Sequence, residues 1–168
     1  MEFEDIIRKR TSVRKFSTKK LEQKVLNKIL EAGRLAPTAK NNQPIKIYVV
    51  NSNEGIEKID KVSRCRYGAQ TILIICGNKE EAYHKGDYTT AEMDCCIVAT
   101  HMMLEATNIG VDNIWVESFD GNILVEEFQI PDEYTPFILM PLGYKTEDCP
   151  INPLHDKRKV IEDIVEYK

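Results

Sequence analysis

One stretch of the sequence, from about Thr89 to Asn108, constrains the fold more than any other. Apolar residues such as those of Cys95–Ala99 and Met102–Leu104 fall on more than one side of a helix drawn through it. A helix that is apolar nearly all round has to be buried. The pattern therefore predicts a long central helix, covered by the rest of the chain or by a second subunit, and ended by Gly110.

Shorter segments of both kinds surround this helix. Spacing and cap residues predict helices over 2–9, from a Ser17 or Thr18 cap to Pro37, over 53–62, over 122–128 and over 158–166. Apolar runs predict strands over 46–51, 71–76, 111–116 and 135–142. Several connections are too short for a regular series of crossover helices. We therefore expect an α+β fold and not a doubly wound sheet.

Composition narrows the class of protein. A chain of 168 residues fits one domain, spanning 1–168, and its 23 basic against 27 acidic residues give a net charge of −4. That balance argues against a generally basic nucleic-acid coat. No apolar run approaches the roughly 18 residues of a membrane span, and the acidic start Met1–Asp5 lacks the apolar region of a secretion signal. We expect a cytoplasmic protein with neither membrane nor nucleic-acid partners.

Cysteine and histidine usage gives no metal signal. The five cysteines include no Cys-x-x-Cys pair, and the three histidines lie far apart in the chain. Neither His-Glu-x-x-His nor a calcium-loop pattern occurs. We expect buried, reduced thiols and no metal site.

The segment Arg10-Thr11-Ser12-Val13-Arg14 is the first candidate binding site. If it is extended, Arg10, Ser12 and Arg14 share one face because side chains alternate along a strand. Two guanidinium groups around a hydroxyl suit a phosphate dianion. The alternative is a solvated basic surface that continues the neighbouring Arg8, Lys9 and Lys15.

Two further segments are weaker candidates. Between Pro37 and Pro44 the loop carries the side-chain amides of Asn41, Asn42 and Gln43, which offer the donors and acceptors that a heterocycle edge needs. Ordinary turn chemistry explains the same residues. Near the end of the chain, the run 157–159 is cationic where a helix is expected to begin. Positive charge opposes the helix dipole there, which favours an anion site over a solvated helix start.

Taken together and in order, several segments resemble the FMN-dependent nitroreductase family. They are Arg10-x-Ser12-x-Arg14-x-Phe16, Ala36-Pro37-Thr38-Ala39-x-Asn41-x-Gln43-Pro44, the helix and strand from Asp94 to Trp115, Trp115–Asp120, Pro141–Tyr144 and Arg158-Lys159-x-x-x-Glu162–Val165. The resemblance covers nearly the whole chain. It implies an α+β homodimer with a central mixed, mostly antiparallel sheet flanked by helices, and with FMN at the subunit interface.

The resemblance also implies roles for individual residues. Its cofactor-binding set here is Arg10, Thr11, Ser12, Arg14, Pro37, Thr38, Asn41, Gln43, Glu117, Ser118, Arg158 and Lys159. Arg10, Ser12 and Arg14 would hold the phosphate and ribityl chain, joined by Arg158 and Lys159. The loop from Pro37 to Gln43 would approach the ring, in part from the other subunit. Backbone N–H groups of Glu117 and Ser118 would face flavin N5 and stabilise negative charge on the reduced ring.

Two positions and the length of one segment depart from the family pattern. Position 118 is serine where glycine is frequent, position 45 is isoleucine where tryptophan is common, and little sequence separates Cys76 from the central helix. The chain should therefore lack the helices that cover the substrate channel in longer members.

The activity that the resemblance implies is a ping-pong oxidoreductase. NADH or NADPH would reduce FMN and then leave, and a nitroaromatic, quinone or similar small acceptor would take the electrons. No side chain is assigned as acid or base, since packing or surface roles better explain His84, Tyr67 and Tyr88. A flavin-binding carrier or sensor with little turnover is one alternative. A small RNA- or phosphate-binding domain is another, which the net negative charge disfavours.

Overall fold

A fully buried strand forms the centre of the molecule. The computed structural model describes residues 2–168, and strand β2 (Thr71–Asn78) is buried at every position. It lies between β1 (Ile45–Val50) and β6 (Tyr134–Gly143), with the short β5 (Asp112–Asn113) outside β6. All these pairs are antiparallel. The expected α+β class is confirmed, but the four-stranded sheet is not mixed: among residues 2–168, parallel pairing occurs only at the isolated bridge between Ser12 and Asn113.

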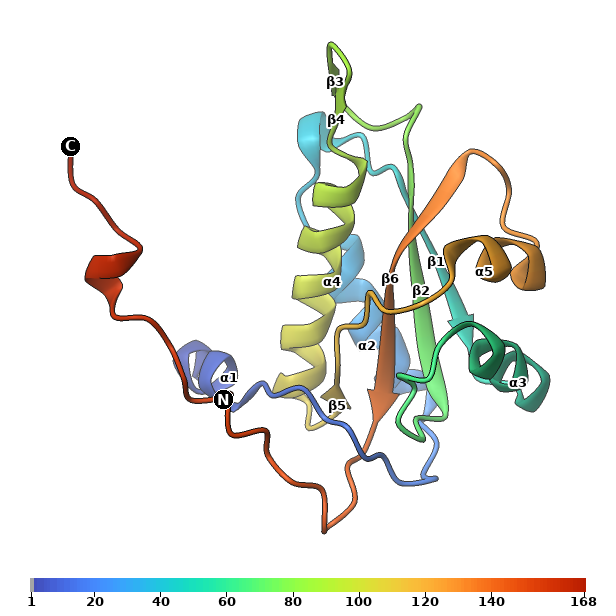
Figure 1. The fold of residues 1–168 in the computed structure, drawn as a ribbon, viewed down its shortest axis with the longest axis vertical. Helices are drawn as coiled ribbons and strands as arrows, with labels where there is room; N and C mark the ends of the chain where they lie inside the picture. The colour runs from blue at the N-terminus through green and yellow to red at the C-terminus, as the bar shows by residue number, and fades with distance from the viewer. Residues whose placement is uncertain (1) are drawn as a thin grey trace.

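Helices cover both faces of this sheet (Figure 1). On one face lie α2 (Gln23–Arg34) and α4 (Ala91–Asn108), and on the other α3 (Asn53–Val62) and α5 (Gly121–Phe128). Alternate residues of β2 serve the two sides: Leu73 and Ile75 join the core with α2 and α4, whereas Ile72 and Ile74 join the core with α3 and α5. The near-continuous apolar run of β2 therefore follows from its burial on both faces.

The predicted central helix is present as α4. Its residues Cys95, Val98, Ala99 and Met102 are buried against the sheet and α2. Gly33 lets α2 approach closely, since a Cβ at that position would lie 2.7 Å from Met102 Cγ. Gly110 follows the helix with a φ of +79°, as expected of a residue after a helix C-terminus.

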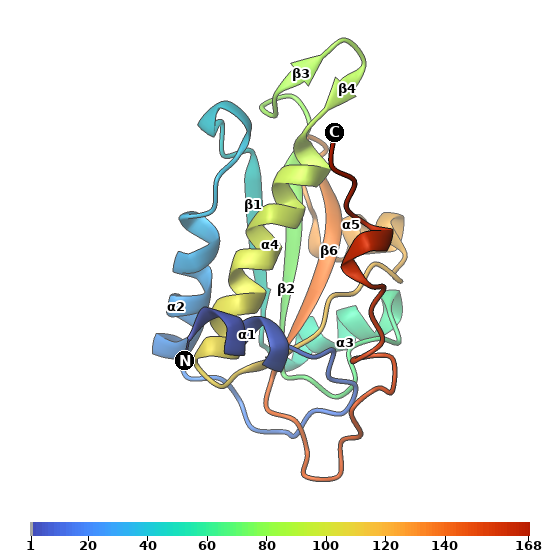
Figure 2. The ribbon, with the colours of Figure 1, turned by 90° about the vertical axis from the view of Figure 1, so that its left-hand side faces the viewer.

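The remaining elements complete the two ends of the molecule. Helix α1 (Phe3–Lys9) lies across the lower end of α4 in Figure 2. At the opposite end, a hairpin of β3 (His84–Lys85) and β4 (Tyr88–Thr89) extends beyond the sheet. Two single-turn 3₁₀ helices, η1 and η2, span Ala39–Asn41 and Ile161–Asp163. Among the described residues, no helix has the length and apolar character that a bilayer crossing requires.

Two predicted boundaries were wrong because hydrogen bonds between distant segments decide where these elements begin and end. Helix α2 begins after Glu22 and not after Ser17 or Thr18, since Ser17 N–H donates to the Tyr144 carbonyl and keeps that segment extended. The predicted strand 111–116 is regular only in β5. Beyond it, Ile114 and Val116 donate singly to carbonyls of β6.

The predicted tail helix over 158–166 was also wrong. Only η2 is helical there, and its first residue Ile161 and its C-cap Ile164 are about two-thirds exposed, at 65% and 67%. A helix this short gains most of its stability from packing an apolar face. Residues 156–168 are all exposed, so in a single chain no face of the predicted helix is buried, and only one turn forms.

One buried carboxylate connects α4 to the loop before β1. Asp94 lies in the first turn of α4 and is 1% exposed. Its carboxylate accepts from the Ala39 N–H at 2.9 Å and from the Thr90 hydroxyl at 2.8 Å. A negative charge in the first turn also interacts favourably with the helix dipole. Asp94 therefore fixes η1 to the start of the central helix.

We expect Asp94→Ala to destabilise the fold by about 1–3 kcal/mol, because the Ala39 and Thr90 donors lose their partner. Urea unfolding measures the loss, and hydrogen exchange should show faster exchange at Ala39. Asp94→Asn keeps an acceptor oxygen and should retain most of that protection. Glu92→Ala, on the exposed face of the same turn, is the control. Unchanged exchange at Ala39 in Asp94→Ala would show that the carboxylate does not hold the loop.

Candidate functional site

The segment 10–16 is extended, as predicted, because two of its buried residues are held by neighbouring segments. Val13 and Phe16 are buried in the core, and their N–H groups donate to the carbonyls of Asn113 and Tyr67. Side chains on the opposite face are left partly or fully exposed, among them Ser12 and Arg14. The edge of the sheet thus presents a short polar strip.

The tail of the chain brings further polar groups to this strip. A cavity of about 200 Å³ is lined by Arg10, Thr11, Ser12, Arg14, Asn152, Leu154, His155 and Arg158. His155 fixes the tail at this place, since its Nε2 lies 3.2 Å from the Arg8 carbonyl. Arg158 therefore joins the first segment, as expected from the resemblance. Lys159 is exposed and does not line the cavity.

The cavity carries positive charge that no side chain neutralises. Arg10, Arg14 and Arg158, called here the arginine cluster, form no ion pair with a carboxylate within residues 2–168. Burial, and then the nearby Arg158 guanidinium, lower the pKa of Arg10. Uncompensated cations around a hydroxyl form a site suited to a phosphate or similar anion.

The loop 37–44, called here the amide loop, has an unusual backbone. Lys40, Asn41 and Gln43 have φ values of 53°, 57° and 52°, in the left-handed region that favours glycine. The Thr38 hydroxyl accepts from the Gln43 N–H at 3.0 Å, and the Asn42 side chain donates to the Glu81 carbonyl at 2.9 Å. Such strained conformations persist where the surroundings hold them, and they cluster at ligand sites.

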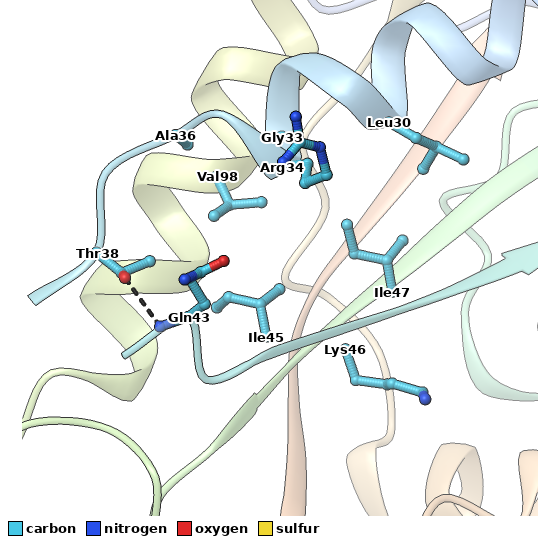
Figure 3. A pocket seen from close by; sticks show the side chains of 10 residues that line it. All are labelled: Leu30, Gly33, Arg34, Ala36, Thr38, Gln43, Ile45, Lys46, Ile47 and Val98. Carbon is cyan, nitrogen blue, oxygen red and sulfur yellow. Dashed lines mark hydrogen bonds between the residues drawn. The ribbon is translucent and has the colours of Figure 1, made fainter. Parts of the chain in front are cut away.

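A second cavity opens beside the amide loop (Figure 3). Its volume is about 250 Å³, and Thr38 and Gln43 line it together with Leu30, Gly33, Arg34, Ala36, Ile45, Lys46, Ile47 and Val98. Most of these side chains are apolar. Gln43 thus places one amide at the edge of a mostly apolar surface, an arrangement suited to a flat heterocycle.

Within one chain, the amide loop and the arginine cluster do not meet. Figures 1 and 2 both place the loop at the upper end of the sheet, near β3 and β4, and residues 10–14 toward the lower end. Asn41 and Gln43 are therefore not brought to the cavity of Arg10 and Arg14 by the fold of a single chain.

Residues 115–120 cross from β5 toward α5 and expose backbone donors. Val116 N–H donates to the Leu139 carbonyl, whereas the N–H groups of Glu117 and Ser118 have no partner within residues 2–168. The Glu117 carboxylate accepts from Trp115 Nε1 at 2.7 Å, so it does not compete for these donors. Two adjacent free N–H groups can stabilise negative charge on a bound group.

The earlier acid–base candidates take other roles or stay exposed. His84 and Tyr88 lie on the exposed hairpin. The pKa of Tyr67 is raised, first by its interaction with the Cys65 thiol and then by burial, while the Arg14 guanidinium acts in the opposite direction. In the described part of the chain, no group of three or more His, Cys, Asp or Glu residues could hold a metal ion.

Sequence reasoning did not find four residues that shape this region. The sequence around Asn152 and His155 shows only two nearby prolines, which predict an extended connector and no binding role. No motif in the sequence marks Ser63 as a functional residue. Asp94 could have been found as an acidic residue in the first turn of an otherwise apolar helix. All four act through contacts between segments distant in the chain.

Comparisons with known proteins show the family and the fold. The chain aligns end to end with a crystal structure of a nitroreductase family protein from Clostridium difficile 630, with 33% identity, a TM-score of 0.93 and coverage of 100% and 99% of the two chains. A relative from Methanothermobacter thermautotrophicus, provisionally named NADH dehydrogenase/NAD(P)H nitroreductase, is 28% identical over 95% of this chain and 86% of its own. A nitroreductase with bound FMN from Bacteroides fragilis shares the fold, with a TM-score of 0.77 at 23% identity and full coverage of both chains.

The model of the nitroreductase family matches residues 7–67 and 65–144. These ranges contain the extended arginine segment, the amide loop, the central helix and the free backbone donors. The chain therefore belongs to the nitroreductase family.

Proposed function

We propose that this chain is an FMN-dependent oxidoreductase that passes electrons from NADH or NADPH to a nitroaromatic, quinone or similar small acceptor. One observation carries the proposal: within residues 2–168, the arginine cluster of this nitroreductase family chain has no carboxylate partner. An anion is needed there, and the phosphate of FMN supplies one. The FMN-bound relative and the NAD(P)H-related name of another relative support the same choice.

The residues of the lower cavity fit the phosphate end of FMN. Arg10, Arg14 and Arg158 would pair with the phosphate, and the Ser12 hydroxyl would add a neutral donor. Thr11 lines the same cavity. Lys159 lies next in sequence to Arg158 and would add long-range positive charge near the site.

The free N–H groups of Glu117 and Ser118 fit the ring end. When bound, FMN would supply the redox chemistry by accepting a hydride and passing electrons onward. The protein contributes preorganised donors, because the backbone at 117 and 118 need not reorient when charge develops. Trp115 holds the Glu117 carboxylate, so that this negative charge has a partner.

A second copy of the chain would complete the site. The amide loop lies at the other end of the sheet, so Pro37, Thr38, Asn41 and Gln43 could reach a flavin only from a partner subunit. Exposed apolar side chains support such a partner: Phe3 on α1 is 63% exposed and Met93 on α4 is 53% exposed. We therefore propose a homodimer with FMN between subunits. The five cysteines of each chain are free thiols, which suits action in the reducing cytoplasm.

The function is tested by the absorbance spectrum of the purified protein under anaerobic conditions. We expect a yellow protein whose flavin band bleaches on addition of NADH or NADPH and returns on addition of a quinone or nitroaromatic. Adding each nucleotide separately identifies the donor. Flavin that neither nucleotide reduces would instead support the carrier or sensor, and a colourless protein that does not take up FMN would contradict both.

Arg14→Ala should weaken FMN binding by about ten- to a hundredfold, as expected for the loss of one charged hydrogen-bonding partner. FMN fluorescence quenching measures the affinity, and circular dichroism checks the fold. Arg8→Ala removes an exposed arginine outside the cavity and is the matched control. Equal affinity in wild-type protein and Arg14→Ala would remove Arg14 from the phosphate site.

The dimer is tested by sedimentation equilibrium at micromolar concentration with FMN present. We expect twice the 19.3 kDa mass of one chain. A species of one chain mass that still binds FMN would show that a single subunit holds the complete site.

A further inference from the structure

Ser63 is a buried hydroxyl with two hydrogen-bonding partners at the end of α3. The residue is 7% exposed and has an extended backbone, with φ −152° and ψ 138°. Its Oγ donates to the Ser118 carbonyl at 2.7 Å and accepts from the Cys65 N–H at 3.1 Å. The hydroxyl therefore joins two loops that are 55 residues apart in the chain.

The bond to Ser118 fixes the backbone that carries the free donors. The Asp120 N–H also donates to the Val62 carbonyl at 2.9 Å, so the end of α3 holds the segment at two points. Between these points, Phe119 N–H donates to the Glu117 carbonyl and closes a tight turn. This turn leaves the N–H groups of Glu117 and Ser118 unpaired, and Ser63 limits the rotation of the peptide that follows Ser118.

The loop 63–67, which begins with Ser63, also contacts the segment that carries the arginine cluster. The Tyr67 carbonyl accepts from the Phe16 N–H at 2.9 Å, and the Tyr67 phenol lies beside Arg14. Residues 63–67 thus contact both parts of the candidate site. Ser63 contacts only the donor side, through the Ser118 carbonyl.

We propose that Ser63 is a positioning residue, whose hydroxyl aims the Glu117 and Ser118 N–H groups at the redox-active edge of the flavin. This inference rests on the proposed function as an FMN oxidoreductase. Because those donors stabilise negative charge on the ring, their alignment favours reduced over oxidised FMN. Loss of the hydroxyl should then change the redox balance of bound FMN more than its binding in the oxidised state.

The experiment compares Ser63→Ala with Ser52→Ala. Ser52 is the N-cap of the same helix and accepts a hydrogen bond from the Gly55 N–H, so the same substitution removes a hydroxyl that is remote from residues 117 and 118 in the hydrogen-bond network. The midpoint potential of bound FMN is measured by equilibration with a reference dye. FMN affinity and thermal stability are measured in parallel.

For Ser63→Ala we expect about tenfold weaker binding of reduced FMN with little change for oxidised FMN. For a two-electron couple this is a shift of about 30 mV to more negative potential. Ser52→Ala should lower stability and leave the potential unchanged. If Ser63→Ala does not fold, Ser63→Cys replaces it in the experiment. This variant keeps a side chain of similar size that donates poorly, and it should shift the potential in the same direction.

Equal potentials in the wild-type protein and the Ser63 variants would overturn the positioning role while leaving the proposed function intact. An equal shift in Ser52→Ala would overturn it as well, because general loosening of α3 would then explain the effect. A wild-type protein that binds no FMN would overturn the proposed function itself, and this inference with it.

Discussion

Burial of β2 on both faces is the constraint on which the rest of the structure depends. Its alternate side chains enter two separate cores, so each face of the sheet needs its own layer of helices. The apolar character of α4 follows from this need, because α4 covers one face and also packs against α2. Burial raises the pKa of the Cys76 thiol to about 12 and also raises the pKa of Cys95. These two cysteines therefore behave as small apolar residues.

The candidate site is built at the edge of this sheet from segments that do not themselves form long strands. Ser12 pairs with Asn113 of β5. Beyond β5, Ile114 donates to the Pro141 carbonyl, and Val116 exchanges two backbone hydrogen bonds with Leu139 of β6. The sheet therefore fixes both the arginine segment and the free backbone donors in one frame. The loop 63–67 then contacts both of them. A rigid sheet edge with polar groups attached holds donors in place better than a free loop could.

The exposed and strained features of the chain fit the proposed dimer with bound FMN. The arginine cluster lacks a counter-charge, the amide loop holds non-glycine residues at positive φ, and the tail exposes apolar side chains. Each costs free energy in an isolated chain. A bound phosphate would neutralise the first, and a partner subunit would cover the others.

The amino-acid sequence predicted much of the fold. The central helix, the limits of α3 and the buried strand β2 came from periodicity and apolar runs, because these report local geometry and burial directly. The alternation of Arg10, Ser12 and Arg14 likewise determined that they share one face. Local pattern could not show that Ser17 stays extended, because its partner is Tyr144.

The sequence by itself predicted the α+β class, the central helix, the buried strand β2 and an extended segment that carries Arg10, Ser12 and Arg14. Only the tertiary structure decided that Arg158 lies beside Arg10, that Ser63 binds the Ser118 carbonyl, and that the amide loop lies at the other end of the sheet. The physical reason is that periodicity reports which side of an element is buried, whereas these placements depend on pairing between distant segments. The tail shows the same limit: its spacing favours a helix, but without a surface to pack against, only one turn forms.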